Sequence, residues 1–211
     1  MVLLSNSEAF VPKNDYVFKR LFGHVGNEEI TKGLLNSILE TKVEEINLEG
    51  NTILERDLID DKLGVLDIKA VLNNAVTCDI EMQVAEQDNI EERLMYYWSK
   101  MFIGNIHKGD NYGTLRKCIA IMFIDFNLEN LAQIPKSHTE WEIREKDFSK
   151  IVLTEVLELH IISLPKLMEL AEKNKLPEGE KKLKSWVKFL LDPQELGVME
   201  MEGNDALKKA K

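Results

Sequence analysis

Apolar and polar residues alternate along two neighbouring segments in the first half of the chain, residues 62–72 and 75–84. Alternation with a period of two is typical of a β-strand that buries one face. Asn73 and Asn74 separate the two segments, and asparagine tolerates the positive φ angles of a tight hairpin turn. The pattern therefore predicts an antiparallel hairpin.

Other segments show helical spacing or continuous apolar runs. Helices are predicted at 12–23, 27–40, 89–107, 166–174 and 178–192, and further strands at 43–50, 52–58, 117–126 and 151–164. The run 117–126 is almost wholly apolar, which indicates a strand buried on both faces. The tail from Gln194 has weak periodicity, and we expect it to be frayed. This order of elements predicts a mixed α/β domain.

Composition and charge narrow the class of protein. The 211 residues carry a formal net charge of −10, which argues against a general affinity for polyanions, so a nucleic-acid substrate would require a local basic patch or a metal ion. No apolar run is long enough to cross a bilayer, and residues 2–4 are too short for the apolar core of a signal peptide. Cys78 and Cys118 show no motif spacing and suit buried, reduced thiols. We expect a cytoplasmic protein with no membrane partner.

Several common site types find no support in the sequence. The four histidines lack the spacing of a zinc site and have no cysteine partners. The glycine-rich motifs of nucleotide-binding proteins and the nucleophile motif of serine hydrolases do not occur.

Candidate chemistry lies in "TCDIEMQV", residues 77–84, where Asp79, Glu81 and Gln83 share one face of the predicted strand. Pairing through the asparagine turn sets Asp67 opposite position 80, and a one-residue shift or bulge would set it against Glu81 or Asp79. Two carboxylates this close repel each other unless a cation lies between them. A solvated polar face and a metal site both remain open interpretations.

A hard cation such as Mg²⁺ takes oxygen ligands, and Mn²⁺ accepts the same set. Asp67 and Glu81 could supply carboxylates, and Met82 a backbone carbonyl. Gln83 or Lys69 could orient an attacking water or hold a phosphate, although each also has a simpler interpretation, as a surface amide and as an ion-pair partner of a nearby carboxylate. A bound ion would activate water for phosphodiester hydrolysis.

Five linked segments, "PKNDYVFKRLFG", "DDKLGVLDIKA", "DIEMQV", "ERLMYYWSKMF" and "KGDNY", occur in an order and spacing that resemble the Rpn family. These are recombination-promoting nucleases, also described as transposases, within the PD-(D/E)XK nuclease superfamily. The resemblance covers residues 12–126 and extends more loosely to about residue 190. It implies a restriction-endonuclease-like core, in which helices flank a mixed central β-sheet, with C-terminal helices. It also implies Mg²⁺-dependent DNA endonuclease activity, a hydrolase reaction, in bacterial recombination.

The resemblance also implies roles for individual residues. Asp67 matches the acidic residue of the first half of the superfamily motif, and Glu81 and Gln83 match the second half, with Gln in the lysine position. These three are the expected catalytic residues. Asp15 matches an acidic residue of the opening segment and is a candidate for a further acidic group near the metal.

Basic residues gather in the segments next to the expected site. They are Lys13, Lys19, Arg20, Arg93, Lys100, Lys108, Arg116 and Lys117. Lys19, Arg93 and Lys100 are the candidates for contact with DNA phosphates. Tyr96, Tyr97 and Trp98 on the same helix are more typical of core residues than of a base-stacking platform, because residues adjacent along a helix point in different directions.

Two departures from the family pattern motivate an alternative function. Asn105 stands where relatives often have Gln, and the chain after the expected nuclease domain, residues 1–165, is shorter than usual, with a helical extension over 166–211. The alternative is a catalytically idle nuclease fold that serves as a DNA-binding or protein-interaction module. A homodimer remains open, since paired sites can cut both strands of a duplex.

Overall fold

The computed structural model of the protein describes residues 11–49, 67–194, 196–197 and 204–211. Within these ranges the helices and strands are α1 (Asp15–Phe22), α2 (Glu28–Leu35), β1 (Ile46–Glu49), β2 (Ile68–Leu72), β3 (Val76–Gln83), α3 (Ile90–Ile103), β4 (Cys118–Ile124), β5 (His138–Arg144), β6 (Val152–Ser163), α4 (Leu164–Glu172), α5 (Lys181–Leu191) and α7 (Asp205–Ala210). The strand predicted at 52–58 lies outside the described residues.

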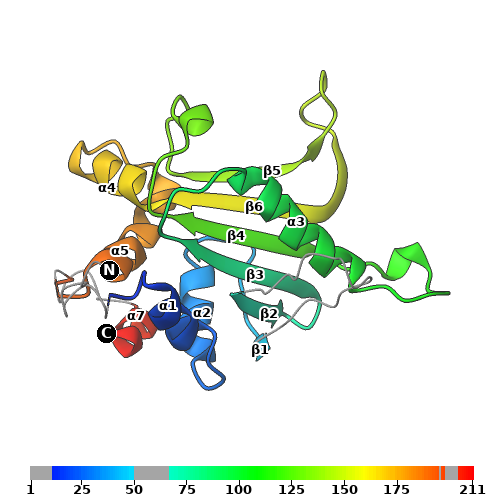
Figure 1. The fold of residues 1–211 in the computed structure, drawn as a ribbon, viewed down its shortest axis with the longest axis horizontal. Coiled ribbons are helices and arrows are strands. Elements are labelled where there is room, and N and C mark those ends of the chain that lie inside the picture. Colours follow the sequence, from blue (N-terminus) through cyan, green and yellow to red (C-terminus); the bar gives the residue numbers. More distant parts are fainter. Residues whose placement is uncertain (1–10, 50–66, 195, 198–203) are drawn as a thin grey trace.

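Six strands form one mixed sheet in the order β1-β2-β3-β4-β6-β5. The strands β3, β4 and β6 are parallel, whereas β1, β2 and β5 run antiparallel to their neighbours. Helix α3 lies across one face, and α1, α2, α5 and α7 gather on the other side (Figure 1). This arrangement confirms the predicted restriction-endonuclease-like fold class.

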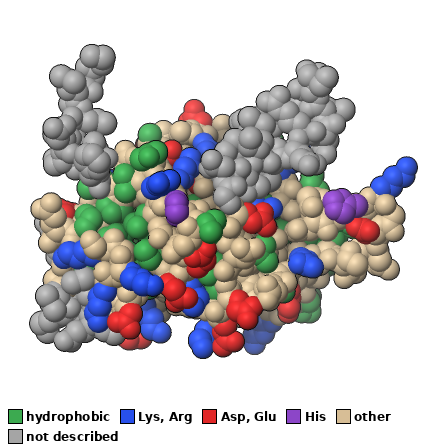
Figure 2. Space-filling model, turned by 90° about the horizontal axis from the view of Figure 1, so that it is seen from below, with side chains coloured by type: hydrophobic (Ala, Val, Ile, Leu, Met, Phe, Trp, Pro, Cys, Tyr) green, Lys and Arg blue, Asp and Glu red, His purple; other side chains and the backbone are tan. Residues whose placement is uncertain are grey.

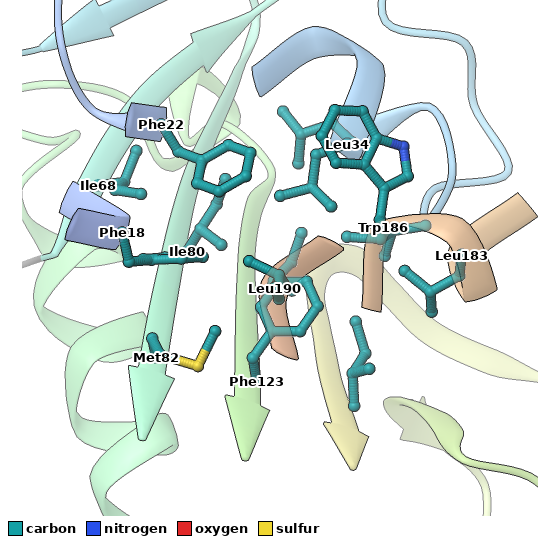
Figure 3. Packing of buried hydrophobic residues seen from close by; sticks show 14 of the residues in the cluster. Phe18, Phe22, Leu34, Ile68, Ile80, Met82, Phe123, Leu183, Trp186 and Leu190 are labelled. Carbon is teal, nitrogen blue, oxygen red and sulfur yellow. The ribbon is translucent and has the colours of Figure 1, made fainter. Parts of the chain in front are cut away.

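The larger hydrophobic core lies between the sheet and the helices α1, α2 and α5. Phe18 and Phe22 of α1 are fully buried against Ile68 and Ile80 of the sheet, and Trp186 of α5 contacts Phe22 from the far side (Figure 3). Helices from both ends of the chain therefore share one core. The division into a nuclease domain, residues 1–165, and a helical extension, residues 166–211, stays a prediction from the sequence.

Helix α1 is held in place by its own ends. The side chain of Asn14 accepts hydrogen bonds from the backbone N–H groups of Tyr16 and Val17, and Gly23 closes the C-terminus. Both residues lie within the segment 12–23 that was predicted to be helical. The two caps fix where α1 starts and ends.

The hairpin turn has one more residue than expected. Asn73 and Asn74 adopt positive φ angles of 48° and 55°, and Ala75 donates a backbone hydrogen bond to the carbonyl of Leu72. Leu72 nevertheless pairs with Val76, so Ala75 is an extra residue and the register is shifted by one. This shift decides which side chains meet at the other end of the hairpin.

Two C-terminal features differ from expectation. The strand β5 was not predicted, although its sequence "HTEWEIR" alternates charged and apolar residues; the run is short, and its apolar residues Trp141 and Ile143 remain exposed at the sheet edge. The tail, expected to be frayed, contains α7, whose Leu207 is fully buried. A methyl group at Gly33 of α2 would collide with the Cβ of Ala206, so the absence of a side chain at Gly33 lets α7 pack against α2.

Candidate active site

Asp67 and Glu81 are tied together across the hairpin. The backbone N–H of Asp67 donates to Glu81 Oε1 (3.1 Å), and the N–H of Met82 donates to Asp67 Oδ2 (3.3 Å). The shifted register places these residues side by side, one of the two arrangements allowed by the sequence analysis. The Asp67 side chain is 7% exposed and that of Glu81 is fully buried. The two carboxylates are thus held rigidly and mostly away from water.

Two cations from opposite faces of the sheet reach this pair. Lys19 of α1 places its Nζ 2.9 Å from Asp67 Oδ1 and also 2.9 Å from Asp15 Oδ1. Arg93 of α3 places Nη2 3.7 Å from Glu81 Oε2. The fold therefore brings Asp15, Lys19 and Arg93 to the carboxylates, as the sequence predicted for positions near the site.

Arg93 is oriented by further contacts within its own region. Its Nη1 donates to Gln87 Oε1 (3.0 Å), and its guanidinium carbon lies 5.3 Å from the centre of the Tyr97 ring. Lys100 follows Arg93 by two helical turns and lies on the same side of α3. Trp98, in contrast, is buried and donates its indole N–H to the carbonyl of Cys118 (2.9 Å), which makes it a core residue.

The electrostatics of the pair favour a cation. Burial, followed by the negative charge of Asp67, raises the pKa of Glu81 to about 7, against the opposing effects of the Asp67 N–H and Arg93. Burial also raises the pKa of Asp67, while Lys19 opposes the increase. Burial lowers the pKa of Lys19, but the hydrogen bonds to Asp15 and Asp67 outweigh this effect and raise it. The site thus carries more negative charge than its own side chains neutralise.

Asp79 is a buried acid that the sequence analysis placed on this face without giving it a role. Its side chain is fully buried, and neither carboxylate oxygen has a hydrogen-bond partner among the described residues. Burial, followed by the charges of Glu81 and Asp67, raises its pKa well above the usual value. Because Glu81 is also an acceptor, the two carboxyl groups can share a hydrogen bond only when one is protonated. The signal for Asp79 was its position two residues before Glu81 on one face of the strand.

Lys69 and Gln83 lie further from the carboxylate pair. Lys69 is the register partner of Asp79, but its Nζ lies 2.9 Å from Glu49 Oε2 of β1, in agreement with the simpler ion-pair interpretation. Gln83 is buried at the end of β3, on the same face as Glu81 and two residues beyond it. The backbone carbonyl of Gln83 accepts a hydrogen bond from the N–H of Asp125 (2.9 Å).

Asn105, whose departure from the family pattern motivated the alternative of an idle module, lies away from the carboxylate pair. It follows the end of α3, and its Nδ2 lies 3.2 Å from the sulfur of Cys118 at the start of β4. Cys118 pairs with Thr77, about 13 Å along β3 from Glu81. Arg116 and Lys117 precede β4 directly and therefore lie at this end as well.

The donor atoms at the site suit a hard divalent cation. Within the described ranges, no three His, Cys, Asp or Glu side chains are arranged to hold a metal ion by themselves. Mg²⁺, however, commonly binds through one or two carboxylates and keeps several waters. Glu81 Oε2 is buried without a hydrogen-bond partner, as are both oxygens of Asp79. A cation beside Asp67 and Glu81 would neutralise this charge, so the residues present fit such an ion.

Comparison with known proteins adds one match. A family model described as PD-(D/E)XK nuclease family transposase matches residues 12–211. No curated protein and no solved structure matches the chain. Within the part of the chain that the structure describes, no helix is long and apolar enough to span a membrane.

Proposed function

The chain belongs to the PD-(D/E)XK nuclease family of transposases, and from that premise we propose that it is a metal-dependent DNA endonuclease. The observation that carries this proposal is the carboxylate pair Asp67 and Glu81. Each accepts a backbone hydrogen bond from the other's strand, while Glu81 Oε2 stays buried without a hydrogen-bond partner. Buried carboxylates with raised pKa values are a common mark of functional sites.

Asp67, Glu81 and the carbonyl of Met82 would hold Mg²⁺, or Mn²⁺ in its place. When bound, the ion supplies Lewis acidity and lowers the pKa of a water molecule. Gln83, on the same face of β3, orients the attacking water or a phosphate oxygen. Asp67, Glu81 and Gln83 are thus the proposed catalytic residues.

Basic side chains next to the pair would hold the DNA backbone. Lys19 and Arg93 already lie against the carboxylates, and binding of a cation would release both of them for contact with phosphates. Lys100 extends the same side of α3. Asp15 holds Lys19 from the solvent side and keeps it close to Asp67.

The compartment and the oligomeric state are part of the proposal. Cys78 and Cys118 are free and buried, which suits a reducing compartment, and we propose the cytoplasm. Cutting both strands of a duplex would require two sites, so we propose that a homodimer acts on double-stranded targets.

A second function is favoured by one observation. The Lys19 ammonium lies where a cation would neutralise Asp67. If Lys19 is never displaced, the fold would act without catalysis, as a module that binds DNA or another protein.

Nicking of supercoiled plasmid tests the two functions. The wild type is incubated with Mg²⁺, with Mn²⁺ and with EDTA, beside Glu81→Ala and the control Glu155→Ala, which changes an exposed residue of β6. We expect metal-dependent nicking by the wild type and the control, and none by Glu81→Ala. DNA binding by the wild type without nicking in either metal would instead support the idle module.

A further inference from the structure

A groove of about 610 Å³ runs between α1 and the C-terminal helices α5 and α7. It is open to solvent and does not include Asp67 or Glu81. Its lining includes Tyr16, Val17, Arg20, Leu21, His24 and Lys211.

The lining combines apolar residues with cationic and aromatic ones. Val17 and Leu21 provide apolar surface, and Arg20 and Lys211 provide positive charge. The Lys211 ammonium already donates a hydrogen bond to the carbonyl of Leu196 (2.6 Å), so Arg20 is the cation available to a ligand. Figure 2, which views the molecule from below, shows lysine and arginine side chains beside hydrophobic ones on this side of the molecule. Arg20 is exposed and has no hydrogen-bond or ion-pair partner among the described residues. A free cation next to apolar surface suits a ligand that is anionic on one side and flat and apolar on the other.

Tyr16 gives the groove an exposed aromatic ring. Its side chain is 73% exposed and lies one turn before Arg20 on the same side of α1. Exposed rings beside arginines are the usual platform on which unpaired bases stack, with the phosphates on the cations. A regular duplex keeps its bases stacked inside and would make little use of the ring or of the apolar lining.

The groove and the candidate active site share α1. Asp15 and Lys19 point to the carboxylate pair, whereas Tyr16 and Arg20 line the groove. Consecutive helical residues differ by about 100° in direction, so the two sites lie on adjoining sides of one short helix. A strand that leaves the carboxylates past Lys19 would reach Arg20 next.

We propose that this groove binds a single-stranded stretch of the DNA substrate, with one base stacked on Tyr16 and a phosphate held by Arg20. The proposal rests on the function proposed above, and it names the substrate as duplex DNA that is locally unpaired beside the cut. His24, on the rim, contacts the same strand.

Binding without cleavage tests the stacking contact. Fluorescence anisotropy is recorded with the full chain in EDTA, using a labelled single-stranded oligonucleotide and a duplex of the same sequence. Tyr16→Ala should weaken binding to the single strand about tenfold, and Tyr16→Phe should keep it, because the ring alone stacks. The control is Tyr112→Ala, which removes a ring that is 81% exposed in the loop after α3. It should bind like the wild type.

Salt dependence tests the phosphate contact. For Arg20→Ala, the slope of log affinity against log salt on the single strand should fall by about 0.7, the value for one lost phosphate contact. Arg116→Ala, which removes an exposed arginine ahead of β4, is the matched control and should leave the slope unchanged.

The possible outcomes separate this proposal from the nuclease proposal. If Tyr16→Ala and Arg20→Ala bind the single strand like the wild type while the wild type still nicks plasmid, the groove proposal is overturned and the nuclease proposal stands. Equal weakening on the duplex would overturn the assignment to single strands. If the wild type binds neither oligonucleotide and nicks nothing, both proposals fail.

Discussion

Two clusters of partly or fully buried polar residues lie on the same sheet, and they differ in how completely their polar atoms are paired. On β5 and β6 the polar atoms form a chain. Lys117 Nζ lies 2.5 Å from Glu158 Oε2, Glu158 Oε1 lies 2.8 Å from His160 Nε2, and His160 Nδ1 lies 2.7 Å from His138 Nε2. On β2 and β3, in contrast, Glu81 keeps one oxygen without a hydrogen bond.

The pKa values of two glutamates, one in each cluster, shift in opposite directions. The hydrogen bond from His160 is the largest effect on Glu158 and lowers its pKa to about 2. Burial is the largest effect on Glu81 and raises its pKa to about 7. A carboxylate whose two oxygens both have partners stabilises the fold, whereas a buried carboxylate with one oxygen left without a hydrogen bond destabilises it and is available for a ligand. The comparison assigns stability to one cluster and function to the other.

The largest expected effect is on catalysis at Asp67. Asp67→Ala should lower plasmid nicking by more than about 100-fold, because it removes a proposed metal ligand and the anchor of Lys19. Circular dichroism should show an unchanged fold. Nicking that survives in Asp67→Ala would contradict the assignment of this cluster to function.

The next largest effect is expected on the free energy of unfolding, at the cluster on β5 and β6. Glu158→Gln removes the ion pair with Lys117 and should lower the free energy of unfolding at pH 7 by about 1–2 kcal/mol. Because the folded pKa is depressed, this contribution is present above about pH 4.5 and is lost as the pH falls toward 2. Urea unfolding at several pH values measures it.

The Glu158→Gln experiment needs a control variant and an outcome that would contradict it. Glu155→Gln, in the exposed part of β6, should unfold like the wild type. A Glu158→Gln variant that lost nicking but kept its stability would reverse the assignment of roles.

The stability contributed by the cluster on β2 and β3 should depend on pH in the opposite direction. The folded pKa of Glu81 is raised, so in EDTA the wild type should lose stability as the pH rises from about 4.5 to about 7. Glu81→Gln removes this loss, which is of the order of 1–3 kcal/mol. Asp67 and Asp79, whose folded pKa values are also raised, contribute losses in the same direction and remain in the variant. Equal pH slopes in urea unfolding of the two proteins would show that Glu81 titrates normally.

The smallest effect is expected at Asn105, which belongs to neither cluster. Asn105→Gln should change the nicking rate by less than about twofold, because the side chain lies beside Cys118, about 13 Å along the sheet from Glu81. A gain of more than tenfold would place Asn105 in the active site after all.

Local signals in the sequence were sufficient for much of the fold. Helical spacing predicted α1 within residues 12–23, the paired asparagines predicted the hairpin, and the apolar run predicted β4 as a strand buried on both faces. Each of these depends on residues that are close in sequence. The carboxylate pair could also be anticipated, because alternation fixes which side chains share a face.

Features that depend on distant contacts could not be predicted. The extra residue Ala75 sets the register, and nothing in the two asparagines specifies it. Lys19 meets Asp67 only after α1 has packed on the sheet, and Lys69 turns to Glu49 only after β1 has paired with β2. The lack of partners around Asp79 is likewise a property of the assembled sheet and α3 rather than of its own strand.

The glycine of α2 has a consequence for how the chain acquires its shape during translation. Gly33 leaves the ribosome about 170 residues before α7, whose Ala206 packs against it. At about 5–20 residues per second, α2 waits roughly 10–35 s for this neighbour. Throughout that interval the surface of α2 that α7 later covers stays exposed on the nascent protein. Chaperones that protect newly made chains would find their binding site there.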